Sequence, residues 1–137
     1  WMLIELLSLG TWSIVYENLA NRKDKKNIAQ FFDLSPIELG SWLHALTYIR
    51  NLCAHHSRIW NRHFTFTPTV KPKYQKYLKP NSTFAAQAAM IHILLKEVLP
   101  KSQWVNRLMA LINDYPIVDI QNMGFQKGWE KESFWVA

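Results

Sequence analysis

The chain has 137 residues, a formal net charge of +6 and 49% hydrophobic residues, with only four glycines and six prolines. This composition excludes disordered and collagen-like chains and is typical of a globular protein. A chain of this length builds one hydrophobic core more readily than two, so we expect a single domain over residues 1–137.

Cysteine content and hydropathy indicate the compartment. The lone Cys53 cannot form an internal disulfide, which favours a reducing compartment such as the cytoplasm. The apolar runs are shorter than the roughly 20 residues that span a bilayer, so we expect no membrane partner. The chain opens inside a helix-like apolar pattern, without Met or a capping residue, and we therefore interpret it as a fragment of a longer protein.

The apolar periodicity is helical through most of the chain. It predicts an all-α bundle of about four to five helices. A first helix is predicted from the start to about residue 18, then a polar turn at residues 21–26 and a short helix at residues 28–32.

A strong helix start follows this short helix. Ser35 suits the N-cap, Pro36 the first helical position, and Glu38 the third position of a capping box. The long central helix that begins here is predicted over residues 36–62, a length at which helices in small domains often bend or break. The later predicted elements are strand signals at residues 64–67, a proline-rich loop with one turn at 74–78, helices at 82–99 and 103–113, and an irregular aromatic C-terminal strap from residue 116 that includes Trp129 and Trp135.

Acidic residues are unevenly distributed along the chain. None occurs between Glu38 and Glu97, a stretch that holds all five histidines and many Lys and Arg side chains. Such a stretch favours a polyanionic partner, with nucleic acid first and acidic membrane surfaces second. A merely solvated basic face fits the charge pattern equally well.

One side of the central helix is polar on a wheel of 100° per residue. This polar front holds His44, Thr47, Tyr48, Asn51, His55, Arg58 and Arg62. The opposite arc is expected to pack against other helices and holds Trp42, Ala45, Leu46, Ile49, Leu52, Cys53, Ile59 and Trp60.

The same wheel separates the histidines. His55 lies on the polar front, whereas its neighbour His56 lies in the apolar arc and is expected to be packed. We also expect core positions for His92, Trp60 and Cys53, which lie on apolar faces.

The segment Arg50-Asn51-Leu52-Cys53-Ala54-His55 has an arginine, a polar residue, three further residues and a histidine. This pattern resembles the motif of the HEPN superfamily, whose members include many metal-independent ribonucleases. The wider sequence resembles the C-terminal half of Abi-like abortive infection proteins, a bacterial phage-defence family, in the runs WMLIE (1–5), SWLH (41–44), YIRN (48–51) and AHHSRIWNR (54–62), and less distinctly in the tail 123–129.

The resemblance implies a HEPN-like fold and a metal-independent endoribonuclease that needs no cofactor. It implies that Arg50 and His55 are the catalytic pair, that Asn51 orients them, and that two such helices meet in a homodimer to form one site. The wheel gives a physical reason for the second copy, because Arg50 and His55 are about 140° apart. They converge only if the helix breaks between them or a partner contributes.

RNA cleavage through the 2′-hydroxyl needs a base, an acid, and positive charge beside the phosphorane. Histidine suits both proton-transfer roles because imidazole ordinarily titrates near neutral pH. One His55 from each chain would therefore serve, with Arg50 stabilising the developing charge. The RNA-binding candidates are Arg58, Arg62, His44, Tyr48, Lys71 and Lys73.

Other chemistries are less well supported. The lack of carboxylates near the motif disfavours a two-metal nuclease, and helical angles scatter the donors of a zinc site, which would be Cys53, His55, His56 and His63. No glycine-rich phosphate loop or G-x-S-x-G elbow supports an ATPase, kinase or serine hydrolase. Two alternatives stay open: a non-catalytic RNA- or protein-binding module, and a structural dimerisation domain whose aromatic tail carries the interface.

Overall fold

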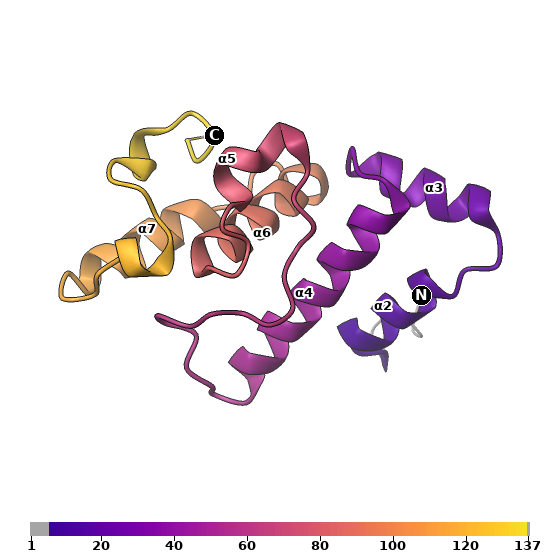
Figure 1. Ribbon diagram of the computed structural model, residues 1–137, viewed down its shortest axis with the longest axis horizontal. Helices are drawn as coiled ribbons and strands as arrows, with labels where there is room; N and C mark the ends of the chain where they lie inside the picture. Colours follow the sequence, from indigo (N-terminus) through magenta and orange to yellow (C-terminus); the bar gives the residue numbers. More distant parts are fainter. Residues whose placement is uncertain (1–5, 137) are drawn as a thin grey trace.

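The computed structural model describes residues 6–136, and this part of the chain is all-helical, as predicted. Figure 1 shows the helix α4 crossing the middle of the molecule, with α2 and α3 on one side of it and α5, α6, α7 and the C-terminal strap on the other. The helices are α2 (Leu9–Glu17), α3 (Arg22–Phe31), α4 (Pro36–Ala54), α5 (Gln75–Leu78), α6 (Phe84–Val98) and α7 (Trp104–Asp114), with short 3₁₀ turns η1 (Pro72–Tyr74), η2 (Gln121–Met123) and η3 (Trp129–Lys131).

Several elements differ from the sequence prediction at their ends. The predicted polar turn at residues 21–26 is wrong: Asn21 caps α3, its side chain accepting a hydrogen bond from the Lys23 amide at 2.9 Å. Ser8 caps α2, and the earlier start predicted for this helix at residues 1–5 lies outside the described residues. The segment 64–67 forms a bend, not a strand.

The capping box predicted for the central helix is confirmed. The Ser35 hydroxyl accepts a hydrogen bond from the Glu38 amide at 3.2 Å, and the Glu38 carboxylate accepts one from the Ser35 amide at 2.7 Å. These paired bonds fix the start of α4. The buried face of α4 then packs against α2, α3 and α6.

The end of α4 was predicted wrongly, because the helix stops at Ala54 and not at residue 62. The His56 amide donates to the Cys53 carbonyl at 3.0 Å, and the Ser57 amide donates to the Leu52 carbonyl at 2.8 Å. This pair of bonds is a Schellman motif, which normally places glycine at the left-handed position. Here His56 occupies that position, with φ of 51°.

The core lies between α4 and α6. Trp42 is fully buried, and its indole Nε1 donates to the Thr69 carbonyl at 2.9 Å, which ties the long loop after α4 to the core. The neighbouring buried residues include Leu39, Ala45, Leu78, Ala88, Ala89 and Met90. The alanines of α6 allow the two helices to approach closely.

The irregular aromatic strap is confirmed. Trp129 and Trp135 are buried, and their rings meet edge to face with centroids 5.1 Å apart. His92 of α6 anchors the strap from below, its Nε2 lying 2.7 Å from the Phe134 carbonyl oxygen. The predicted core position of His92 is therefore confirmed, and this histidine is structural.

The left-handed residue that ends α4 gives a stability prediction. His56→Gly is expected to raise the free energy of unfolding by up to about 1 kcal/mol, because glycine adopts positive φ without the steric cost of an L side chain. His56→Val is expected to lower it by about 1–2 kcal/mol. Urea denaturation of both variants measures this; equal destabilisation by glycine and valine would contradict the motif's role.

The buried histidine gives a prediction about pH. Burial lowers the pKa of His92 below its ordinary value, although the hydrogen bond to the Phe134 carbonyl opposes this. As pH falls below about 6.5, His92 binds a proton in the unfolded chain but stays neutral in the folded chain. The free energy of unfolding therefore declines until the pH reaches the pKa of His92 in the folded chain. Thermal melts between about pH 8 and pH 5 should show this decline in the wild type and a smaller one in His92→Gln. Equal declines in both proteins would rule out His92 as the source.

Candidate functional site

The polar front of α4 is covered in part by the loop that follows the helix. The ring of Tyr48 meets Phe64 and Phe66 edge to face, with centroids 6.4 and 5.0 Å away. The Phe66 ring also contacts His44, with centroids 4.5 Å apart. Arg62 donates to the Tyr48 hydroxyl at 3.4 Å, so the loop carries a cation back onto the helix.

Three of the six RNA-binding candidates, His44, Tyr48 and Arg62, therefore gather on one surface. His44 and Arg58 are exposed, and Tyr48 and Arg62 are half-buried. Arg62 also donates to the Arg58 carbonyl at 3.3 Å, which holds the start of the loop in a turn. The predicted helix through residue 62 is replaced by this turn, yet the Arg62 side chain still reaches the front through Tyr48.

The three catalytic candidates are exposed at the C-terminal end of α4. The Arg50 guanidinium donates to the Asn51 side-chain oxygen at 3.2 Å. His55 is the C-cap, and its backbone amide donates to the Asn51 carbonyl at 3.0 Å. In the described part of the chain, no hydrogen bond joins the His55 ring to Arg50 or Asn51, so the predicted trio does not converge within one chain.

Arg50 instead borders an apolar depression, which we term the α4–α7 groove. Its two connected cavities, of about 490 and 220 Å³, share Ile59, Phe84, Leu108 and Leu111. The remaining lining is apolar apart from Arg50 and Arg107 and consists of Leu46, Ile49, Cys53, Trp60, Ile91, Trp104, Ile112, Tyr115, Val118 and Met123. His55 does not line this groove.

Three core predictions, for Cys53, Trp60 and His56, are wrong. Cys53 is exposed because no described element covers the last part of the apolar arc of α4. Trp60 is 41% exposed because it follows the end of the helix and borders the open groove. His56 is also exposed, because the helix ends before it and the wheel no longer applies. A wheel identifies an apolar face but does not show whether another element covers it.

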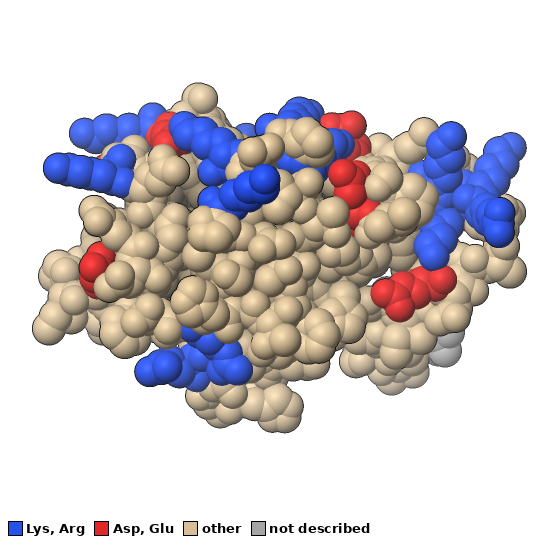
Figure 2. Space-filling model, viewed as in Figure 1, with Lys and Arg blue, Asp and Glu red and all other residues tan. Residues whose placement is uncertain are grey.

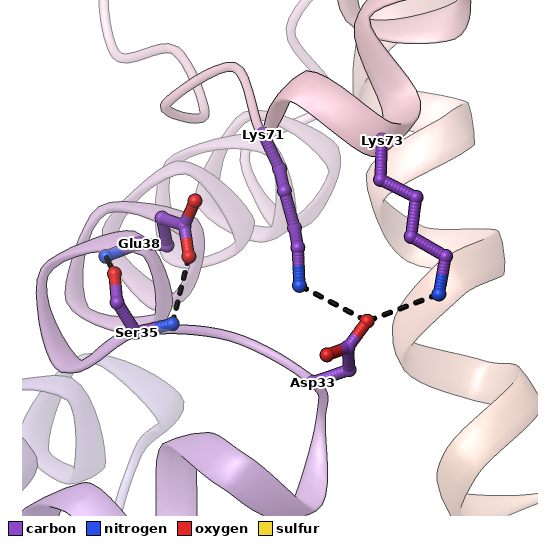
Figure 3. A network of polar contacts seen from close by, with 5 residues as sticks. All are labelled: Asp33, Ser35, Glu38, Lys71 and Lys73. Atoms are coloured by element: carbon purple, nitrogen blue, oxygen red, sulfur yellow. Dashed lines mark hydrogen bonds and ion pairs between the residues drawn. The ribbon is translucent and has the colours of Figure 1, made fainter.

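The lysine candidates lie elsewhere. Figure 3 shows Lys71 and Lys73 reaching toward Asp33, beside the Ser35–Glu38 capping box, and each Nζ is 3.0 Å from the carboxylate. The hydrogen bonds from Lys73 and Lys71 hold the pKa of the Asp33 carboxyl below its ordinary value. These lysines thus sit at the N-terminal end of α4, which is about 28 Å long, and not beside His55.

Other features of the surface were missed by the sequence reasoning. Figure 2 shows Lys and Arg side chains in separate groups, one of them over α3 at the right of the view. This group follows from the run of basic residues at the start of α3, a signal visible in the sequence as Arg22, Lys23, Lys25 and Lys26. The exposed ring of Phe66 and the groove arginine Arg107 gave no such signal.

The arrangement restricts the chemistry of the site. Within residues 6–136, no three His, Cys, Asp or Glu side chains are placed to hold a metal ion, and the proposed zinc set does not assemble. Each described helix is too short or too polar to cross a membrane. What the front offers is imidazole, guanidinium and amide groups, which bind phosphate and transfer protons.

Comparison with known proteins identifies part of the chain. Residues 1–61 match the family model described as Abi-like protein, and this match covers α2, α3, α4 and the candidate catalytic residues. No curated protein and no solved structure is significantly similar to the chain. Over residues 1–61 the similarity to Abi-like proteins that the sequence motifs predicted is therefore confirmed.

Proposed function

We propose that this chain is a metal-independent endoribonuclease of a bacterial abortive-infection system. The Abi-like family match suggests abortive infection. The observation that carries the enzymatic part is the C-terminal end of α4, where Arg50, Asn51 and His55 are all exposed and no acidic residue occurs in the same stretch of sequence. Such a surface attracts the negative charge of a phosphodiester, because this stretch contributes positive side chains and no carboxylate.

In this mechanism His55 removes the proton of the ribose 2′-hydroxyl. The 2′-oxygen forms a bond to phosphorus, the bond from phosphorus to the 5′-oxygen breaks, and a second imidazole protonates the leaving oxygen. Arg50 stabilises the charge on the phosphorane, and Asn51 orients Arg50 through their hydrogen bond. The products are a cyclic 2′,3′-phosphate and a 5′-hydroxyl.

A second copy of the chain supplies the second imidazole. Arg50 lines the α4–α7 groove and His55 does not, so one chain does not present both side chains to the same surface. Contiguous exposed apolar surface of this kind marks an interaction site. Docking of the partner on the groove buries that surface and brings the partner's own α4 end beside Arg50.

A non-catalytic RNA- or protein-binding module is the second candidate. It is favoured by the His55 ring, which no described side chain holds in a defined orientation. Catalytic histidines are normally oriented by a hydrogen bond to their second nitrogen. The structural dimerisation domain is less well supported, because the aromatic tail packs into the core of its own chain.

Cleavage in the presence of a chelator tests the proposal. Labelled RNA with EDTA should be cut by the wild type, and His55→Asn should lose about 100-fold or more of the rate because the acid and base are removed. Arg50→Ala should lose about 100–1,000-fold of the rate, because the charge on the phosphorane is no longer stabilised. The rates are compared by gel electrophoresis.

The matched control for this assay is His56→Asn, since asparagine tolerates the left-handed conformation and lies next to the same helix end. It should cut RNA at the wild-type rate. RNA binding without cleavage by any protein would favour the binding module, and cleavage that depends on added divalent metal would contradict the mechanism.

Docking of two copies on the groove predicts a dimer in solution. Leu111→Glu places a carboxylate on a groove residue that is 56% exposed, so it should produce monomers and abolish cleavage without unfolding the chain. Ile117→Glu is the control, because Ile117 is 93% exposed and lies outside the groove. Analytical ultracentrifugation measures the mass; a monomeric wild type that cleaves RNA would refute the shared site.

A further inference from the structure

The ring of Phe66 is exposed although its backbone is held firmly by the core. Phe66 is 44% exposed, and its carbonyl accepts a hydrogen bond at 3.2 Å from the side chain of Gln87, which is fully buried on α6. A buried amide N–H is costly without an acceptor, so this contact ties the loop to α6. The ring itself is left in contact with solvent.

The residues beside Phe66 are held in the same way. The Phe64 amide donates to the Ser82 carbonyl at 2.8 Å, and the buried Phe64 ring anchors that side of the loop. On the other side, the Thr67 carbonyl accepts from the Ser41 hydroxyl at 3.3 Å, and the Thr67 hydroxyl accepts from the Asn81 side chain at 3.1 Å. The loop therefore presents Phe66 in one preorganised position.

The rings of His44, Tyr48 and Phe66 form what we term the aromatic platform. His44 and Tyr48 pack against Phe66 from α4, with centroid distances of 4.5 and 5.0 Å. Arg62 is bonded to the Tyr48 hydroxyl. The platform and the residues that support it all lie between Glu38 and Glu97, where the sequence has no acidic side chain.

We propose that the aromatic platform stacks an unpaired base of the RNA, with Phe66 as the principal contact. An exposed aromatic ring beside a cation, in a stretch of sequence without carboxylates, suits single-stranded nucleic acid, because every base has a π face and every linkage a negative charge. Tyr48 and His55 are seven residues apart on the same side of α4, or about 10 Å along the axis. The stacked base therefore lies near the phosphate at His55.

This inference rests on the proposed function for its ligand and names the substrate class. A base inside a duplex is already stacked on both faces, so it cannot also stack on a protein ring. Single-stranded RNA should therefore bind in preference to duplex RNA, and the preference should depend on Phe66.

Binding is separated from cleavage by a 2′-O-methyl oligonucleotide, which has no free 2′-hydroxyl to attack phosphorus. Fluorescence anisotropy compares a single strand with the same sequence in a blunt duplex. Phe66→Ala should weaken binding of the single strand about 10-fold or more, the loss typical of one stacked base, and should leave duplex binding unchanged. Phe66→Trp keeps an aromatic ring at this position and should bind the single strand as the wild type does.

Phe31→Ala is the matched control, because Phe31 is a 59% exposed aromatic residue on α3, away from the platform. It should bind within about twofold of the wild type. Phe66→Leu keeps an apolar side chain in the loop but lacks a π face, so it decides the question if the alanine variant folds poorly. Wild-type affinity in Phe66→Leu, equal losses for single strand and duplex, or no RNA binding by the wild type would each overturn the proposal.

The two proposals fail separately in this design. If RNA binding depends on Phe66 but the wild type does not cut unmodified RNA, the proposal for the platform is supported and the nuclease proposal is refuted. If the wild type cuts RNA and Phe66→Ala cuts it at the same rate and at the same positions, the nuclease proposal is supported and the proposal for the platform is refuted.

Discussion

The abrupt end of α4 is the constraint on which the candidate site depends. The Schellman bonds from the His56 and Ser57 amides stop the helix one turn after Arg50 and send the chain back along the front. That reversal is what allows Phe66 and Arg62 to contact Tyr48. A continuous helix to residue 62 would carry Arg58 and Arg62 away into solvent, with no loop over the front. The strained residue at position 56 therefore sets the geometry of the surface beside it.

The charges are divided between the two ends of α4. At its start, Lys71 and Lys73 are both paired with Asp33, so one of their two positive charges is offset by a local carboxylate. At its end, Arg50 and Arg58 are exposed and have no salt bridge among the described residues. Exposed ion pairs contribute little to stability. The positive side chains that have no ion pair, however, determine where an anion is attracted. We therefore expect a phosphate chain to be attracted to the end that carries the candidate catalytic residues.

Local signals in the sequence were sufficient for much of the fold. The Ser35 capping box, the apolar run of α6 and the aromatic strap each appear as predicted, since each depends on neighbouring residues or a strong period. The end of α4 was not predictable, because histidine occupies a position where glycine is the usual signal. Exposure of Cys53 and Trp60 was equally hidden, because burial depends on what covers a face and not on the face itself.

The site was predictable only in part. The motif named Arg50 and His55, and the family match covers both. Phe66 was not predicted, because a single phenylalanine between threonines resembles an ordinary strand residue until the loop is seen to lie on α4. The role proposed for it depends on contacts with distant residues such as Gln87, which no local pattern encodes.

The most direct test of the central claim is the chemistry of the RNA ends. Mass spectrometry of fragments produced by the wild-type chain in EDTA should find cyclic 2′,3′-phosphates and 5′-hydroxyls, because attack by the 2′-oxygen requires both. Fragments that carry 3′-hydroxyls and 5′-phosphates would show that water, and not the ribose, attacks the phosphorus, and would contradict the role assigned to His55.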